Sequence, residues 1–277
     1  MSEERIHRTV SEDGTRIAGR VHGQGAPLVL VHGAFADGDL EWEALLPRLA
    51  DRFTCYLMST RGRGLSADHA DHSPRRVVQD VTAFVESIGE PVALAGVSGG
   101  GMHALGAAAQ TDAVSTLAVY EPVVFEVIDD ATRAAYHEAV VGAGRAVVNG
   151  RPAEAALTFL SFIANDAERA MLSEAEDMLE QVGRYGPIDL LEFQHHVAGY
   201  PGSSPTAPDT LTRIAAPTLI LHGSHTARPW FGEAARHVAE HVADAEVQEI
   251  PEAGHLAVAL GVEAVADAFI SFLAEAP

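Results

Sequence analysis

The residues best suited to chemistry form a short run around Ser98. The run Gly96-Val97-Ser98-Gly99-Gly100 matches the pattern G-x-S-x-G, which is typical of a serine on a sharp turn between a strand and a helix. Such a turn lifts the hydroxyl above the sheet and brings the N–H groups of the helix start beside it. We therefore predict that Ser98 is a nucleophile. A phosphate-binding turn is the alternative, but the run lacks the P-loop lysine and the G-x-G-x-x-G spacing.

A serine hydroxyl needs a base within hydrogen-bond reach, and histidine has a suitable pKa. The chain has 14 histidines, so position must select one of them. His255 lies between the last predicted strand, 246–250, and the last predicted helix, 262–274, and we predict that it is the general base. His237 and His241 are four residues apart, but no third ligand accompanies them, so no metal site is expected.

Alternating strand and helix patterns must position these side chains. The expected strands are 5–10, 15–22, 27–31, 53–59, 91–97, 114–120, 217–221 and 246–250. The expected helices of the core are 41–50, 74–88, 99–109, 229–242 and 262–274. This alternation predicts βαβ crossovers and an α/β fold with a mostly parallel, doubly wound sheet.

The alternation stops after residue 124, where helical patterns take over. We predict an α/β core from residues 1–124 and 209–277, and an inserted helical cap from residues 125–208. Ser173-x-x-Glu176 resembles a capping box that opens one of the cap helices. An insertion at the carboxyl ends of parallel strands lies over the ligand crevice, so we interpret the cap as a lid. A packing appendage without substrate contact is the alternative.

Composition and charge narrow the classes of function. The chain of 277 residues is 47% hydrophobic and 21% charged, as expected of a folded globular protein. The formal net charge of −21 disfavours nucleic acid and anionic membranes as partners and favours a neutral or apolar small-molecule substrate. The charged start, the absence of an apolar run of about 18 residues and the single cysteine, Cys55, predict a cytoplasmic protein. The oligomeric state cannot be read from the sequence.

Together these motifs resemble the α/β-hydrolase family with a helical cap, over nearly the whole chain. His32-Gly33 follows strand 27–31 and resembles the family's oxyanion turn. The resemblance implies an oxyanion hole formed by the backbone N–H groups of Ala34 and Gly99. It also implies that the loop of His255 lies beside the serine turn.

The segment Ser59-Thr-Arg-Gly-Arg-Gly-Leu-Ser66 resembles the family's loop after the next strand. This resemblance implies a structural role in which Arg61 and Arg63 bond backbone carbonyls. Phosphate binding by the two arginines is the alternative.

The acid that supports the base departs from the family pattern. The family places an aspartate after strand 217–221, but Thr226 stands at that position and cannot carry a negative charge. Glu121 ends strand 114–120 at the same edge of the sheet, and its placement resembles that in lactonases of the zearalenone-cleaving kind. We therefore predict Glu121 as the triad acid. Another carboxylate such as Asp129, or a Ser–His dyad without an acid, remains an alternative.

These parts predict a serine hydrolase that cleaves an ester or lactone through an acyl-enzyme without a cofactor. The same triad also suits carbon–carbon bond hydrolysis or perhydrolysis. A non-catalytic binding protein and a lyase or cyclase on this fold remain open as well. Phe35, beside the oxyanion turn, and Trp230 are the expected pocket walls, and the preferred substrate is an apolar ester or macrolactone.

Overall fold

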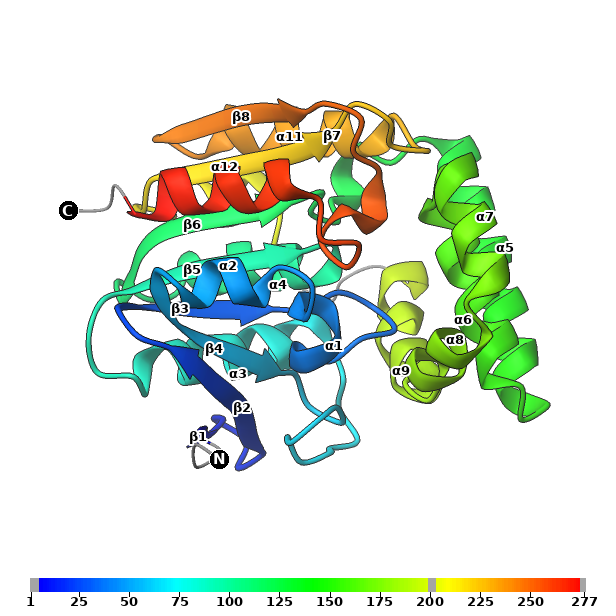
Figure 1. The fold of residues 1–277 in the computed structure, drawn as a ribbon, viewed down its shortest axis with the longest axis horizontal. Helices are drawn as coiled ribbons and strands as arrows, with labels where there is room; N and C mark the ends of the chain where they lie inside the picture. Colours follow the sequence, from blue (N-terminus) through cyan, green and yellow to red (C-terminus); the bar gives the residue numbers. More distant parts are fainter. Residues whose placement is uncertain (1–4, 199–202, 275–277) are drawn as a thin grey trace.

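A computed structural model describes residues 5–198 and 203–274, which form an eight-stranded sheet with helices on both faces (Figure 1). The strand order is β1-β2-β4-β3-β5-β6-β7-β8. β2 pairs antiparallel with β1 and β4, and all other neighbours are parallel. The strands are β1 (Arg5–Val10), β2 (Arg16–Gly23), β3 (Ala26–Val31), β4 (Phe53–Ser59), β5 (Val92–Val97), β6 (Val114–Tyr120), β7 (Thr218–Gly223) and β8 (Ala245–Ile250). All eight predicted strands are confirmed, with ends that differ by at most two residues.

Two layers of helices cover the sheet and confirm the doubly wound arrangement. One face carries α3 (Pro74–Glu86), α4 (Gly99–Ala108) and α11 (Trp230–His241), and the other carries α1 (Gly38–Trp42), α2 (Leu46–Ala50) and α12 (Glu263–Ala274). The predicted helix 41–50 is thus two short helices. Each layer packs an apolar stripe onto the sheet, and the central strand β5 is buried along its whole length. Burial on both faces explains why this strand reads as a continuous apolar run.

A helical insertion joins β6 to β7 and lies beyond the carboxyl ends of the parallel strands (Figure 1). Its helices are α5 (Asp130–Val148), α6 (Pro152–Ile163), α7 (Asp166–Glu174), α8 (Glu176–Gly183) and α9 (Gly186–Ala198), and α10 (Pro208–Leu211) follows on the way back to the core. The boundaries at 124/125 and 208/209 remain predictions, and residues 1–4, 199–202 and 275–277 lie outside the described residues. No described helix has the length and apolar character needed to cross a membrane.

The predicted capping box at Ser173 is wrong. Ser173 lies inside α7, where its hydroxyl donates to the carbonyl of Ala170. The capping box of α7 is formed by Asn165 and Glu168, whose side chains and backbone N–H groups bond reciprocally at 2.9 Å. The correct pair therefore starts the preceding helix rather than α8.

A buried guanidinium attaches the insertion to the core. Arg63, in the loop after β4, lies 2.8 Å from the Asp189 carboxylate and 3.0 Å from that of Glu192, both on α9. It also donates to the Gly33 carbonyl at 3.3 Å. Two buried carboxyl groups thus share one cation. Burial raises the pKa of Asp189 to about 6 and that of Glu192 to about 7, against the opposing effect of Arg63.

The neighbouring Arg61 is buried and fully bonded within the core. It donates to the Asp80 carboxylate at 2.6 and 2.7 Å and to Asp13 at 2.9 Å. It also bonds the carbonyls of Asp71 and Arg76. The expected contacts of both arginines with backbone carbonyls are therefore present, and buried carboxylates, which the sequence analysis did not anticipate, neutralise the charge of each guanidinium.

Glu192→Gln tests the shared cation through the pH dependence of stability. Unfolded glutamate titrates near pH 4.3, so between about pH 4.5 and 7 the folded chain holds a proton at Glu192 that the unfolded chain has lost. This contribution makes the free energy of unfolding fall as pH rises. We expect Glu192→Gln to gain stability relative to wild type as pH rises through this window, measured by urea unfolding. A difference that is constant with pH would contradict the shared-cation account.

Asp80→Asn tests the buried pair of Arg61. Both side chains are fully buried, so removing one charge leaves the guanidinium undercompensated, and we expect a loss of about 3–5 kcal/mol in the free energy of unfolding. The matched control is Asp267→Asn, which breaks the exposed pair with Arg48 and should cost less than about 1 kcal/mol. Chemical denaturation measures the free energy of unfolding of both variants. Equal losses would contradict a larger contribution from the buried Arg61–Asp80 pair.

Candidate active site

Ser98 lies on a strained turn between β5 and α4. Its backbone has φ 55° and ψ −124°, a conformation that non-glycine residues rarely adopt. Two bonds hold the turn: the Ser98 N–H donates to the Tyr120 carbonyl at 3.0 Å, and the Ser98 carbonyl accepts from Val123 at 3.2 Å. A Cβ at Gly100 would lie 2.3 Å from the His32 carbonyl oxygen, and one at Gly96 would lie 2.6 Å from that of Gly100. The two flanking glycines are therefore a steric requirement of the turn.

The structure brings Glu121 and His255 together in the interior. Glu121 follows β6 with φ 43° and is fully buried. Its Oε2 lies 2.6 Å from His255 Nδ1, and its Oε1 accepts from the Gly223 N–H at 2.9 Å. Thr226, at the position where the family has aspartate, donates its hydroxyl to the same carboxylate at 3.4 Å. Because an ionised carboxylate only accepts hydrogen bonds, this contact places the proton of the neutral imidazole on Nδ1. Nε2 of His255 then has a free lone pair and is an acceptor.

Aromatic packing links His255 to a cavity that Ser98 borders. The imidazole of His255 stacks on the Phe231 ring, with centroids 4.4 Å apart and planes inclined by 21°. Phe231 and Ser98 both line this cavity. The backbone N–H next to the imidazole, that of Leu256, donates to Glu168 on α7 at 2.8 Å. The insertion thus contacts the His255 loop as well as the Arg63 loop.

Ala34 and Gly99 both border the cavity beside Ser98. Bonds on each side hold the Ala34 turn: the Gly33 N–H donates to Glu41 at 3.1 Å, and the Phe35 N–H donates to both oxygens of Asp189 at 3.2 Å. Burial, together with the charge of Arg63, lowers the pKa of His32 to about 3, so this imidazole is neutral. Its Nε2 accepts from the Thr60 N–H at 3.1 Å, and its Nδ1 lies 2.8 Å from the Gly33 carbonyl. The turn is therefore fixed by the core and by the insertion together.

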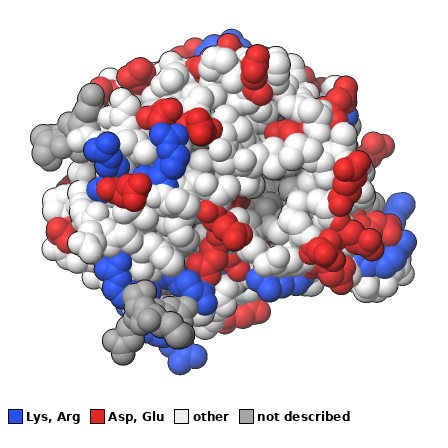
Figure 2. Space-filling model, in the orientation of Figure 1, with Lys and Arg blue, Asp and Glu red and all other residues white. Residues whose placement is uncertain are grey.

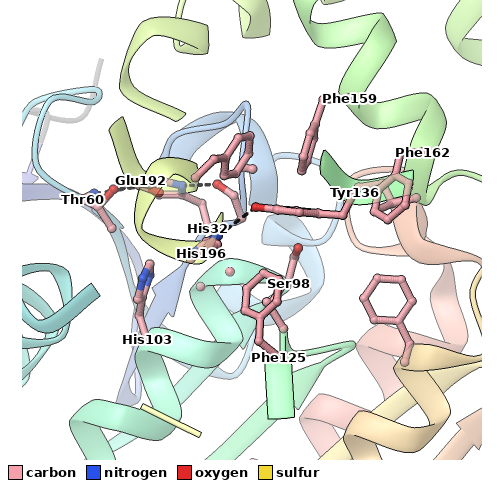
Figure 3. A pocket seen from close by; sticks show the side chains of 18 of the residues that line it. His32, Thr60, Ser98, His103, Phe125, Tyr136, Phe159, Phe162, Glu192 and His196 are labelled. Carbon is pink, nitrogen blue, oxygen red and sulfur yellow. Dashed lines mark hydrogen bonds between the residues drawn. The ribbon is translucent and has the colours of Figure 1, made fainter. Parts of the chain in front are cut away.

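The cavity above Ser98 has an apolar side and a polar side (Figure 3). Its apolar lining comes from Val123, Phe125, Phe159, Phe162, Ile163, Phe193, Trp230 and Phe231. Its polar lining includes His32, Thr60, Arg63, His103, Glu192 and His196, and Tyr136 links the two sides through a 2.9 Å bond to His196. Burial lowers the pKa of His196 to about 3 and holds that of His103 well below its ordinary value, so both imidazoles are neutral.

The two predicted wall residues lie in different places. Trp230 lines the cavity and donates its indole N–H to the Val124 carbonyl at 2.7 Å. Phe35 lies behind the cavity wall, with its ring 5.6 Å from that of Phe159. It borders a separate surface groove between the insertion and the core, which Ala34 also lines. Figure 2 shows a hollow in this face of the molecule with acidic side chains around it.

Other sequence candidates lie away from this site. Asp129 is exposed and caps α5 by accepting from the Thr132 N–H. His237 bonds the Thr206 carbonyl, and His241 bonds the carbonyl of His237. Within residues 5–198 and 203–274, no group of three or more His, Cys, Asp or Glu side chains is placed to hold a metal ion.

Sequence reasoning missed most of the polar lining. Glu192, Tyr136 and His196 belong to no motif. His103 gave the best available signal, because it is the one ionisable residue in the small-residue helix that Ser98 opens. It lies five residues after Ser98, on the first turns of α4, where a side chain can reach the end of the sheet.

Comparison with known proteins agrees with this architecture. An α/β hydrolase from Sphaerobacter thermophilus has a TM-score of 0.74 at 27% identity, covering 96% of this chain and 99% of that one. An esterase from a Rhodococcus species has a TM-score of 0.73 at 22% identity, covering 98% and 99%. A pimeloyl-[acyl-carrier protein] methyl ester esterase of Stenotrophomonas maltophilia is 39% identical over 99 residues, so the match spans 36% of this chain and only 37% of that relative.

The family model described as the alpha/beta hydrolase family matches residues 28–268, which is most of the chain. The matched segment contains the Ser98 turn, the end of β6 and the His255 loop, together with the helical insertion between β6 and β7. The chain therefore belongs to the alpha/beta hydrolase family.

Proposed function

We propose that this protein is a serine hydrolase that cleaves carboxylic esters or lactones, with Ser98 as nucleophile, His255 as base and Glu121 as acid. The observation that carries the proposal is the 2.6 Å bond between the Glu121 carboxylate and His255 Nδ1. A buried carboxylate in that position stabilises the imidazolium that forms when the base takes a proton. Glu121 supplies the negative charge that Thr226 cannot carry.

The reaction follows from these groups. His255 Nε2 takes the proton of Ser98 while the serine oxygen bonds the carbonyl carbon. The N–H groups of Ala34 and Gly99 donate to the oxyanion. The C–O bond to the alcohol then breaks, and the alcohol leaves with the proton from His255. Water repeats the sequence on the acyl-enzyme and releases the acid.

The proposed substrate class is supported by the lining of the cavity and by the names of similar proteins. Aromatic rings form the apolar side of the cavity, which suits an uncharged small molecule. Several structural neighbours are named as esterases, including that from Rhodococcus, and so is the Stenotrophomonas relative. These names favour esters over other acyl compounds. A lactone is an internal ester and suits the same chemistry, and the insertion acts as the lid over the acyl group.

Ser98→Ala gives the first test, by intact mass after exposure to a fluorophosphonate. This reagent phosphonylates an activated serine and requires no knowledge of the substrate. We expect a single adduct on the wild-type protein and none on Ser98→Ala, because the variant lacks the hydroxyl of the proposed nucleophile. Folded wild-type protein that remains unlabelled would overturn the proposed function.

Glu121→Gln tests the choice of acid through the rate of the same labelling. Glutamine keeps the size of the side chain but removes its charge, so we expect labelling to slow by about 10²–10⁴-fold. Asp129→Asn is the matched control: its carboxylate is exposed on α5, and we expect the wild-type rate. Equal rates for Glu121→Gln and Asp129→Asn would leave Ser98 as nucleophile but exclude Glu121 as acid.

A further inference from the structure

The polar side of the cavity is not used by the proposed triad. His103, Glu192, Thr60 and His32 lie on one side of the Ser98 hydroxyl, and Phe162 lies on the other (Figure 3). These polar side chains come from α4, from α9 and from the loops after β3 and β4. Three separate parts of the core and one helix of the insertion therefore converge on this end of the cavity.

His103 has a hydrogen-bonding atom with no partner in the protein. The side chain is 4% exposed and lines the cavity. Among the described residues, no donor or acceptor lies within hydrogen-bond reach of its Nδ1. A buried polar atom without a partner costs about 1–3 kcal/mol, and alanine or leucine would fill a helix position among Gly, Ala and Leu without that cost. A buried polar atom without a partner requires an explanation, and because the His103 side chain lines the cavity, we take a ligand bound there as that partner.

The charged groups around His103 restrict the charge of a ligand group that binds there. Its pKa is held well below the ordinary value by burial and then by His196 and Arg63, so it presents a neutral imidazole. Arg63, the cation among the described residues of the cavity wall, is neutralised by Asp189 and Glu192, although its Nε–H has no hydrogen-bond partner among the described residues. A substrate carboxylate would find no free positive charge, and a substrate ammonium would lie beside the Arg63 guanidinium. A neutral group is therefore favoured.

One hydroxyl group has the donor and the acceptor needed to hydrogen-bond His103 and Glu192 at once. Neutral imidazole Nδ1 either donates or accepts, and the Glu192 carboxyl offers an acceptor oxygen in either protonation state. A hydroxyl donates one bond and accepts another, whereas a carbonyl only accepts. We propose that His103 and Glu192 form a subsite for a hydroxyl group of the substrate, on the part of the molecule that lies across the cavity from the aromatic wall. This inference rests on the proposed function and narrows its substrate class to hydroxyl-bearing esters or lactones.

The test compares two series of 4-nitrophenyl esters that differ in one group. One series has a 4-hydroxyphenyl acyl group and the other a 4-methylphenyl group, each with no, one or two methylene spacers before the carbonyl. Methyl matches the size of hydroxyl but forms no hydrogen bond. We expect kcat/KM for the hydroxyl member to exceed that for the methyl member by about tenfold or more at the best spacer.

Variants of His103 assign the preference to this subsite. His103→Leu should bring the ratio of the two kcat/KM values to about one, whereas His103→Asn, which keeps a hydrogen-bonding atom near the position of Nδ1, should retain most of it. His237→Leu makes the same change at a buried histidine that bonds Thr206 outside the cavity, and should leave the ratio at the wild-type value. Fluorophosphonate labelling of each preparation shows that its site is intact.

The outcomes separate this proposal from the proposed function. Wild-type protein that cleaves both series with equal kcat/KM, or prefers the methyl series, would overturn the hydroxyl subsite and leave the hydrolase in place. A hydroxyl preference that survives His103→Leu would overturn the role of His103. Protein that is labelled but cleaves none of the six esters also counts against the subsite. Protein that is neither labelled nor active would overturn both.

Discussion

Backbone strain at the carboxyl edge of the sheet is the constraint on which the rest of the structure depends. Among the described residues, four positions other than glycine have positive φ: Phe35, Ser98, Glu121 and Glu252. They follow β3, β5, β6 and β8, so every one lies at the edge where the candidate site forms. Each such position costs about 1–3 kcal/mol and persists only where its surroundings dictate the turn. The buried central strands β3, β5 and β6 supply those surroundings for Phe35, Ser98 and Glu121.

The insertion takes part in fixing the same turns. Asp189 of α9 accepts from the Phe35 N–H and pairs with Arg63, which in turn bonds the Gly33 carbonyl. Both peptide groups that flank Ala34 are thus held by a network shared between insertion and core. A buried network of this kind is strong only when every member is present. The position of the insertion and the geometry of the Ala34 turn therefore depend on the same contacts.

The sequence predicted what depends on local pattern. The strands could be predicted because burial on both faces requires continuous apolar runs. Ser98 could be predicted because its turn requires glycine two residues before it and two residues after it. Contacts between residues far apart in the sequence were harder to predict. The capping box forms at Asn165 rather than at Ser173. Several segments contain a residue pair that suits a capping box, and tertiary packing decides which pair forms it. Phe35 lies behind the cavity wall, where its ring packs against Phe159, a contact that the spacing of these residues in the sequence does not reveal. The polar lining joins residues from 32 to 196, a grouping that no spacing reveals.

Hydrogen bonds from two strand ends converge on the buried carboxylate of Glu121. Thr226 and the Gly223 N–H, both in the segment where the family has its aspartate, now donate to the carboxylate that comes from β6. In this chain the segment supplies hydrogen-bond donors to the carboxylate rather than a charge of its own. Glutamate has an extra methylene, which lets a carboxylate based on the neighbouring strand reach His255 Nδ1. Gly223 donates to Oε1 of Glu121, and Thr226 donates to Oε2, the oxygen that also contacts His255, so both oxygens of the buried carboxylate are hydrogen-bonded. The contact between Glu121 and His255 therefore depends on residues at the ends of two neighbouring strands, β6 and β7.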